Sequence, residues 1–252
     1  MAGDNMVQFT IEIAGIAYNI QANFSSTESY CRKFITDQTG KRMISVTKED
    51  IAAERLNINA LDDEQASERS GYSDAYLETI ALLRKLAESA PEGDSMLIHS
   101  SAVCVDGKAY LFAAPSGTGK STHARLWREM LGDRAIMVND DKPFIAKNEN
   151  IFYVCGSPWN GKHGLGNPIQ APLAGICLLH QAETNSISKL TAAQALPGVM
   201  AQCYIPRKAD NAIAALGLID ELLKSVPIYS LGCDISREAA ELSYNTMKFR
   251  NP

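Results

Sequence analysis

A glycine-rich stretch, "APSGTGKST" from Ala114 to Thr122, contains residue types that bind phosphate groups. It follows an apolar run that ends at Ala113, and it precedes a segment with helical periodicity. The pattern is G-x-x-x-x-G-K-[ST], with Ala114 in the place of the first glycine. We therefore expect a strand, a phosphate-binding loop and a helix in succession. An incidental glycine-rich turn is the alternative.

Each residue type in this loop has a physical role in binding a nucleoside triphosphate. Gly117 and Gly119 allow backbone N–H groups to turn toward phosphate oxygens, and the N-terminus of the following helix adds positive potential. Lys120 can reach the β- and γ-phosphates, and the Ser121 hydroxyl can bind magnesium. ATP and Mg²⁺ are the expected ligands. The residues expected to bind them are Ser116, Gly117, Thr118, Gly119, Lys120, Ser121 and Thr122.

A second stretch, "RAIMVNDDKPFI", brings two adjacent acids to the end of an apolar run. Neighbouring carboxylates are costly to desolvate, so we expect a cation at Asp140 and Asp141. The interval between Lys120 and Asp140 accommodates a helix, a turn and a strand, which would bring the acids to the same sheet edge as the loop. Because side chains alternate along a strand, one acid should face magnesium and the other an acceptor hydroxyl. The alternative is simple pairing with Lys142.

A third stretch, "SPWNGKHGLGNP", is rich in glycine and lacks periodicity, which indicates a loop. We expect this loop to lie over the site. Lys162 or His163 could stabilise charge on a transferring phosphoryl group. Trp159 could pack on the substrate, or it could anchor the loop in the core.

The unit "LIHSSAVCVDGKAYLFAAPSGTGKST…VNDDKP" resembles the catalytic domain of the HPr-type serine kinase/phosphorylases, and this chain looks like a divergent member. More distantly, the unit resembles the ATP-dependent phosphoenolpyruvate carboxykinases. The resemblance implies that Asp140 is the general base, that His99 orients it, and that Asp141 lies on the magnesium side with Ser121. Lys120 completes the implied catalytic set. From the sequence alone, His99 could equally be a structural residue.

The family's downstream Arg-Gly-Leu-Gly stretch is matched only loosely, by Gly164-Leu165-Gly166. His163 stands in the place of the arginine, so the sequence departs there from the family pattern associated with the phosphorylase reaction. The HPr kinases are oligomers, so the resemblance also implies a homo-oligomer.

The elements around these motifs predict two domains. Residues 1–90 should form a small α+β N-terminal lobe with an acidic loop from Asp62 to Gly71. Residues 91–252 should form the P-loop kinase-like catalytic domain, with an α/β fold and the mixed sheet of the carboxykinase and HPr kinase type. Hairpins are expected at Ala14-Gly15 and Asp106-Gly107. Capping pairs are expected at Ser25/Glu28 and Thr47/Asp50. Further strands are expected at 43–46, 97–105, 108–113, 135–139, 144–147, 151–155, 173–180 and 226–231, and helices at 73–89, 122–131, 211–225 and 236–247.

Composition narrows the class of partner. The net charge is −5 and the pI is near 5.4, which argues against nucleic acid as a partner. No apolar run is long enough for a membrane helix, and the start lacks the features of a secretory signal. Six cysteines without a C-x-x-C pair indicate a reducing compartment, which makes the cytoplasm the expected location.

Together these features predict a Mg-ATP-dependent kinase that transfers the γ-phosphoryl group to a hydroxyl, with serine of a protein or peptide as the expected acceptor. A small-molecule kinase or a carboxykinase-like enzyme is one alternative. A non-catalytic ATP-binding regulatory protein is the other.

Overall fold

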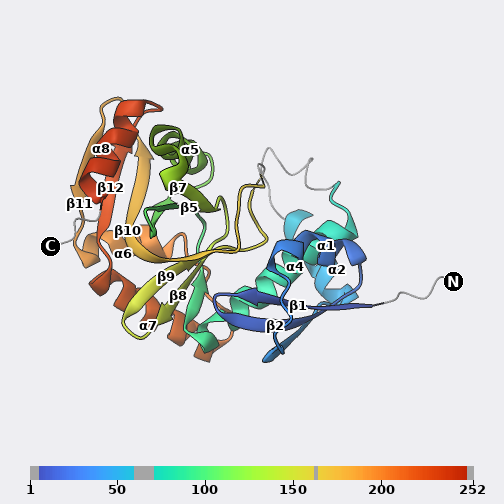
Figure 1. Ribbon diagram of the computed structural model, residues 1–252. Coiled ribbons are helices and arrows are strands. Elements are labelled where there is room, and N and C mark those ends of the chain that lie inside the picture. Colours follow the sequence, from blue (N-terminus) through green and yellow to red (C-terminus); the bar gives the residue numbers. More distant parts are fainter. Residues whose placement is uncertain (1–5, 60–70, 162–163, 249–252) are drawn as a thin grey trace. The chain divides into compact units, whose positions relative to one another are not determined.

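The computed structural model describes residues 6–59, 71–161 and 164–248 (Figure 1). The chain divides into two compact units, Met1–Glu88 and Ser89–Pro252. Residues 62–70 of the expected acidic loop lie outside the described residues, and so do Lys162 and His163. None of the described helices is long and apolar enough to cross a membrane.

The N-terminal unit is built on a hairpin that turns at Ala14-Gly15, as expected. β1 (Val7–Ile13) pairs antiparallel with β2 (Ile16–Ala22), and β2 pairs in parallel with β3 (Arg42–Ser45). Ala14 and Gly15 have φ values of 54° and 76°, which the turn of a two-residue hairpin requires. One face of this sheet buries Ile11 and Ile13 of β1 and Ile20 of β2.

The helices of this unit begin in different ways. α2 (Lys48–Asn59) starts with the expected capping pair, in which the Thr47 amide donates to Asp50 at 2.7 Å and the Asp50 amide donates to Thr47 at 3.3 Å. The expected Ser25/Glu28 pair is wrong, because α1 (Ser25–Cys31) has Phe24 at its N-cap and no cap from its own side chains. A distant residue, Glu78, fills that role.

Glu78 lies on α4 (Asp74–Ser89) and is fully buried. Its carboxylate accepts hydrogen bonds from the Asn23 amide at 2.6 Å, the Phe24 amide at 3.1 Å and the Thr27 hydroxyl at 2.5 Å. This carboxylate satisfies backbone donors that the start of α1 would otherwise leave unpaired.

The C-terminal unit contains a large mixed sheet in the order β4-β8-β9-β10-β6-β5-β7, with β12 beside β10 and β11 beside β12. β10 runs parallel to β6 and β12 but antiparallel to β9, so parallel and antiparallel pairings meet on this one strand. The unit is therefore α/β with a mixed sheet. Its strands are β4 (Ser95–Leu97), β5 (Ser100–Val105), β6 (Lys108–Ala113), β7 (Ala135–Asn139), β8 (Phe144–Asn148), β9 (Ile151–Cys155), β10 (Gln170–Gln181), β11 (Ser186–Lys189) and β12 (Ile228–Cys233).

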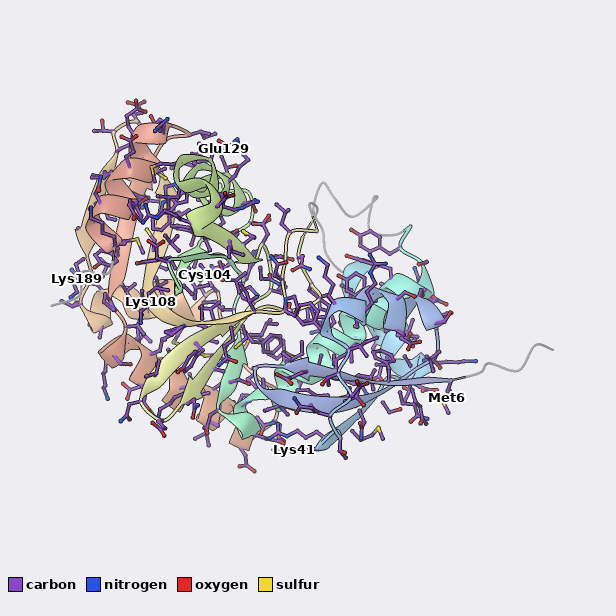
Figure 2. The ribbon with its side chains drawn as sticks, viewed as in Figure 1. Met6, Lys41, Cys104, Lys108, Glu129 and Lys189 are labelled. Carbon is purple, nitrogen blue, oxygen red and sulfur yellow. The ribbon has the colours of Figure 1, made fainter. Side chains whose placement is uncertain are left out.

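Helices cover both faces of this sheet (Figure 1). α6 (Ala192–Met200) and α7 (Ala209–Ser225) pack on one core, through residues such as Val199 and Leu222. α5 (Lys120–Leu131) and α8 (Arg237–Met247) pack on the other, where Trp127 is fully buried. On the outer face of α5, Arg125 pairs with Glu129 at 2.7 Å, and both side chains are exposed. Glu129 is labelled in Figure 2.

Three details depart from the sequence expectations. The strand expected at 97–105 is divided, because β4 pairs with β8 whereas β5 pairs with β6 and β7. β11 and α6 were not expected at all. The register between β5 and β7 also shifts: Val103 lies opposite Met137, and Ala102 lies opposite Asn139. Val138 is therefore one extra residue in β7, two positions before Asp140.

Candidate active site

The strand order brings the loop and the acids to one edge of the sheet. β6 and β7 each run antiparallel to β5, so they run parallel to one another with β5 between them. The glycine-rich loop leaves the end of β6 and the acids leave the end of β7, at the edge where β5 begins. The spacing of Lys120 and Asp140 predicted this shared edge. It did not predict that His99 and Ser101, at the start of β5, lie between them.

The loop from Ala114 to Gly119 turns back on itself before α5. Gly117 and Gly119 have φ values of 79° and 113°, a region that favours glycine. Ala114 does not have positive φ, so alanine at the first position of the motif causes no backbone strain. α5 begins at Lys120, two residues earlier than expected, and its N-terminus therefore faces the loop.

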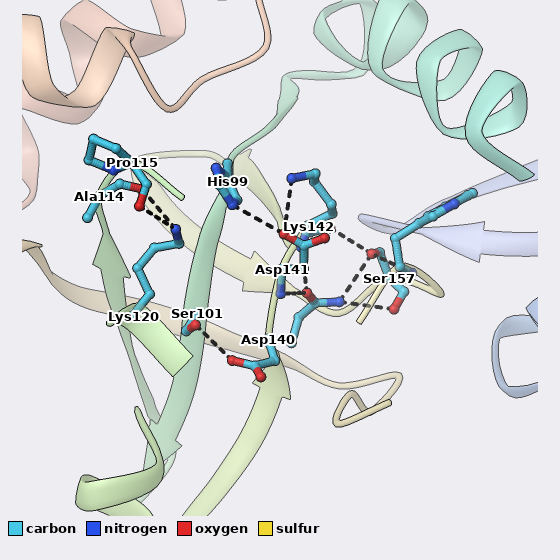
Figure 3. Close-up of polar contacts among 11 residues, drawn as sticks. His99, Ser101, Ala114, Pro115, Lys120, Asp140, Asp141, Lys142 and Ser157 are labelled. Carbon is cyan, nitrogen blue, oxygen red and sulfur yellow. Dashed lines mark hydrogen bonds and ion pairs between the residues drawn. The ribbon is translucent and has the colours of Figure 1, made fainter. Parts of the chain in front are cut away.

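Lys120 is buried, with 7% of its surface exposed, and its side chain turns back toward the loop (Figure 3). Nζ donates to the carbonyl oxygens of Ala114 at 2.9 Å and Pro115 at 3.1 Å. Burial, followed by the charge of Lys142, lowers the pKa of Lys120, and the two aspartates oppose this effect. Burial and repulsion from Lys142 both disfavour the charged ammonium group. An anion bound beside Lys120 would offset both of these costs.

The two aspartates have different partners, as side-chain alternation predicted. Asp140 is buried, and its Oδ1 accepts a hydrogen bond from the Ser101 hydroxyl at 2.8 Å. Asp141 is partly exposed, and its Oδ1 lies 3.3 Å from Nε2 of His99 and 3.0 Å from Nζ of Lys142 (Figure 3). The expectation that His99 contacts Asp140 is therefore wrong. The pairing with Lys142, considered as an alternative, exists for Asp141.

The environment of Asp141 favours its charged form. Burial alone would raise its pKa, but the hydrogen bond from His99 and the charge of Lys142 outweigh burial and lower it. Asp141 is thus ionised at neutral pH.

A buried amide, Asn139, holds the turn that presents both acids. Its Oδ1 accepts hydrogen bonds from the backbone amides of Asp141 and Lys142, each at 2.8 Å. Its Nδ2 donates to the Ser157 carbonyl at 3.0 Å and to Oδ1 of Asn160 at 2.8 Å. Asn139 was not predicted as a site residue, although an amide before "DDK" was a usable signal because Asn side chains commonly bond the backbone two residues on.

The segment after β9 lies beside the acids, and Ser157 connects this segment to Lys142, the residue that follows them. The Ser157 hydroxyl donates to the Lys142 carbonyl at 2.6 Å, and the Lys142 amide donates to the Trp159 carbonyl at 3.3 Å. Trp159 is only 3% exposed. This burial agrees with the alternative in which Trp159 anchors the loop in the core, and it leaves almost no side-chain surface open to a substrate. Gly156 is required here, because a Cβ would lie 2.0 Å from the Asn167 carbonyl oxygen.

These groups surround a cavity of about 400 Å³, within the range of small-molecule sites. Of the residues expected to bind the nucleotide, Thr118 alone is not in its wall. Among the described residues, no cluster of three or more His, Cys, Asp or Glu side chains is arranged to hold a metal ion by itself. The wall consists of His99, Ser116, Gly117, Gly119, Lys120, Ser121, Thr122, Asp140, Asp141 and Gly161.

Comparisons with known proteins find similarity among solved structures. No family model matches the chain, and no curated protein matches it. Among solved structures, the chain is similar to the Hpr(Ser) kinase/phosphatase from Coxiella burnetii at 12% identity and a TM-score of 0.36. That match covers 60% of this chain and 95% of the other. The function of this chain is therefore argued from its own geometry.

Proposed function

We propose that the protein is a Mg-ATP-dependent kinase that transfers the γ-phosphoryl group to a hydroxyl, with serine of a protein or peptide as the acceptor. One observation carries the proposal: a buried lysine in a glycine-rich loop and two aspartates face the same cavity. This combination supplies what phosphoryl transfer requires, namely cations and amides for the phosphates and a carboxylate for the acceptor.

The loop suits the triphosphate. Amides of the turn around Gly117 and Gly119 and the start of α5 provide positive potential toward the cavity. Phosphate oxygens would replace the Ala114 and Pro115 carbonyls as partners of Lys120. A charged partner forms a stronger hydrogen bond with an ammonium group than a neutral carbonyl does, so this exchange favours binding.

The geometry favours Asp141 as the base, in place of the sequence expectation for Asp140. The side chain of Asp141 is 32% exposed, which allows an acceptor hydroxyl to reach it, and His99 fixes its orientation. Asp140 is buried beside Ser101 and is better suited to the metal side. Carboxylate and hydroxyl oxygens are the ligands that Mg²⁺ prefers, and Asp140 and Ser121 supply both types in one cavity. Bound Mg²⁺ would neutralise charge on the phosphates.

Calorimetric titration of ATP, with and without Mg²⁺, tests this proposal in the full chain. We expect Mg²⁺-dependent binding that Lys120→Ala abolishes and Asp140→Asn weakens. Asp141→Asn should keep ATP affinity within about threefold but reduce phosphoryl transfer by about a hundredfold or more. Arg125→Ala, on the exposed face of α5, is the control and should leave both unchanged.

Three other outcomes would change the proposal. Absence of ATP binding by the wild type would refute it. Tight ATP binding with a biological role that survives Asp141→Asn would favour a non-catalytic nucleotide-binding regulator. Transfer to a small hydroxyl compound in place of a serine peptide would change only the acceptor.

A further inference from the structure

A second cavity of about 460 Å³ lies in the C-terminal unit beside the first. It is formed by the start of α5 and by the segments that follow β10 and β12. Its volume is within the range of pockets that hold small organic ligands. None of the catalytic groups proposed above is in its wall. The wall consists of Thr118, Gly119, Thr122, His123, Leu126, Gln181, Ala182, Glu183, Cys233, Asp234 and Ile235.

The two cavities meet at the loop. Gly119 and Thr122 line both of them, whereas Asp140 and Asp141 line only the first. The order along the surface is thus the second cavity, the loop with the start of α5, and then the acids. A molecule with phosphates at the loop and its reacting end at the acids would extend its other end into the second cavity.

The walls of this second cavity suit an uncharged aromatic ring. Leu126, Ala182 and Ile235 provide apolar contact, and the Ile235 side chain is 76% exposed and therefore open to a ligand. The His123 ring is uncharged at neutral pH, because burial lowers its pKa to about 4. A planar base would cover these apolar groups.

The rim excludes phosphate and suits a sugar. Glu183 and Asp234 are exposed carboxylates on this wall. The pKa of Asp234 is lowered mainly by a hydrogen bond with Ser236 and next by one with Asn185, so its carboxylate stays charged. Carboxylates repel a polyanion but accept hydrogen bonds from hydroxyl groups such as those of ribose.

We propose that this second cavity is the nucleoside subsite, which holds the base and ribose of the triphosphate whose phosphates bind the loop. The inference rests on the proposed function, because it requires phosphates at the loop. It adds the residues that distinguish a nucleotide from an inorganic polyphosphate. Apolar contact and ribose hydrogen bonds then supply affinity that the phosphates alone do not.

Two probes separate the subsite from the phosphate site: MgATP and magnesium tripolyphosphate, titrated calorimetrically into the full chain. We expect the wild type to bind MgATP at least about tenfold more tightly than tripolyphosphate. Ala182→Phe fills the cavity and should reduce MgATP affinity to that of tripolyphosphate. Ile235→Ala removes one exposed wall residue and should weaken MgATP about threefold. Neither variant should change tripolyphosphate binding.

The matched control is Ile213→Ala, because Ile213 is 69% exposed on α7 and lines neither cavity. It should leave both affinities unchanged. Equal affinity of the wild type for the two probes would overturn the subsite and leave the phosphate site in place. So would an advantage for MgATP that survives both Ala182→Phe and Ile235→Ala. Failure of the wild type to bind either probe would overturn the proposed function, and the subsite with it.

Discussion

His99 Nε2 lies 3.3 Å from Oδ1 of Asp141, and this contact joins the start of β5 to the residues that follow β7. The adjacent acid, Asp140, accepts a hydrogen bond from Ser101, which lies on β5. His99, directly before β5, and Ser101, on β5, thus contact one carboxylate each. The division gives Asp141 an imidazole partner and Asp140 a hydroxyl partner.

Removal of the imidazole is expected to raise the pKa of Asp141. The hydrogen bond from His99 lowers this pKa in the native protein, so His99→Ala should move the titration of the Asp141 carboxyl to higher pH. NMR of the carboxyl carbon measures this without an assay of activity. If Asp141 is the base, the acid limb of the rate profile should shift in the same direction, and turnover should fall about tenfold. An unchanged titration would contradict the assigned contact.

The amide of Asn139 is expected to contribute strongly to stability. Asn139→Ala would leave the Asp141 and Lys142 amides without their acceptor, inside a buried network. We expect a loss of about 2–4 kcal/mol in the free energy of unfolding by urea. Asn245→Ala, on the exposed side of α8, should cost less than about 0.5 kcal/mol. Similar values for the two variants would show that the turn does not depend on Asn139.

Glu78 is expected to stabilise the start of α1 from a distance. Glu78→Ala removes the acceptor of the Asn23 and Phe24 amides, so the free energy of unfolding should fall by about 2–3 kcal/mol. Hydrogen exchange followed by mass spectrometry should show lost protection at these amides. Asp74→Ala, which breaks an exposed ion pair with Arg55, should cost less than about 1 kcal/mol. Unchanged protection around Phe24 would be inconsistent with this capping role.

His123 is expected to make the protein sensitive to acid. Its Nε2 lies 2.9 Å from the Ser243 hydroxyl, and burial lowers its pKa from 6.5 to about 4. Between these values the unfolded chain binds the additional proton, so stability rises with pH across this window and is lost as pH falls through it. The loss should reach about 3 kcal/mol below pH 4.

Urea unfolding at several pH values, followed by tryptophan fluorescence, measures this effect. His123→Gln should reduce the dependence on pH between about 6.5 and 4. His180→Gln provides the control, because His180 is exposed on β10. If His123→Gln unfolds with the same pH dependence as the wild type, another group is responsible.

Local patterns predicted much of this structure. The turns at Ala14-Gly15 and Asp106-Gly107 require positive φ at both residues. Glycine and aspartate tolerate this conformation, and Ala14 adopts it at a steric cost. The helix after the loop ends at Gly132, as expected, because glycine permits the φ of 57° found there. Such features depend on a few neighbouring residues, so they can be identified from the sequence.

Features that depend on pairing between distant segments could not be predicted in this way. β11 is short and polar, so it has no strong local signal. α6 contains Pro197, which argues against a helix, although its capping box of Thr191 and Gln194 was a usable local signal for the helix start. The break at Ile98 arises because β4 and β5 pair with different strands. The partner of His99 depends on the register of β5 against β7, which no local pattern fixes. The role of Lys162 or His163 in stabilising the phosphoryl group stays a prediction.

The extra residue in β7, Val138, determines which way the following side chains face. Without it, Asn139 and both acids would each move by one position, and every side chain would turn to the opposite face of the sheet. Asn139 would lose the turn that it binds, and Asp140 would no longer face Ser101. A single-residue deletion at Val138 would therefore leave the composition of the site intact but reverse its orientation. The geometry of this site thus depends on a residue count as much as on the types of residue that line it.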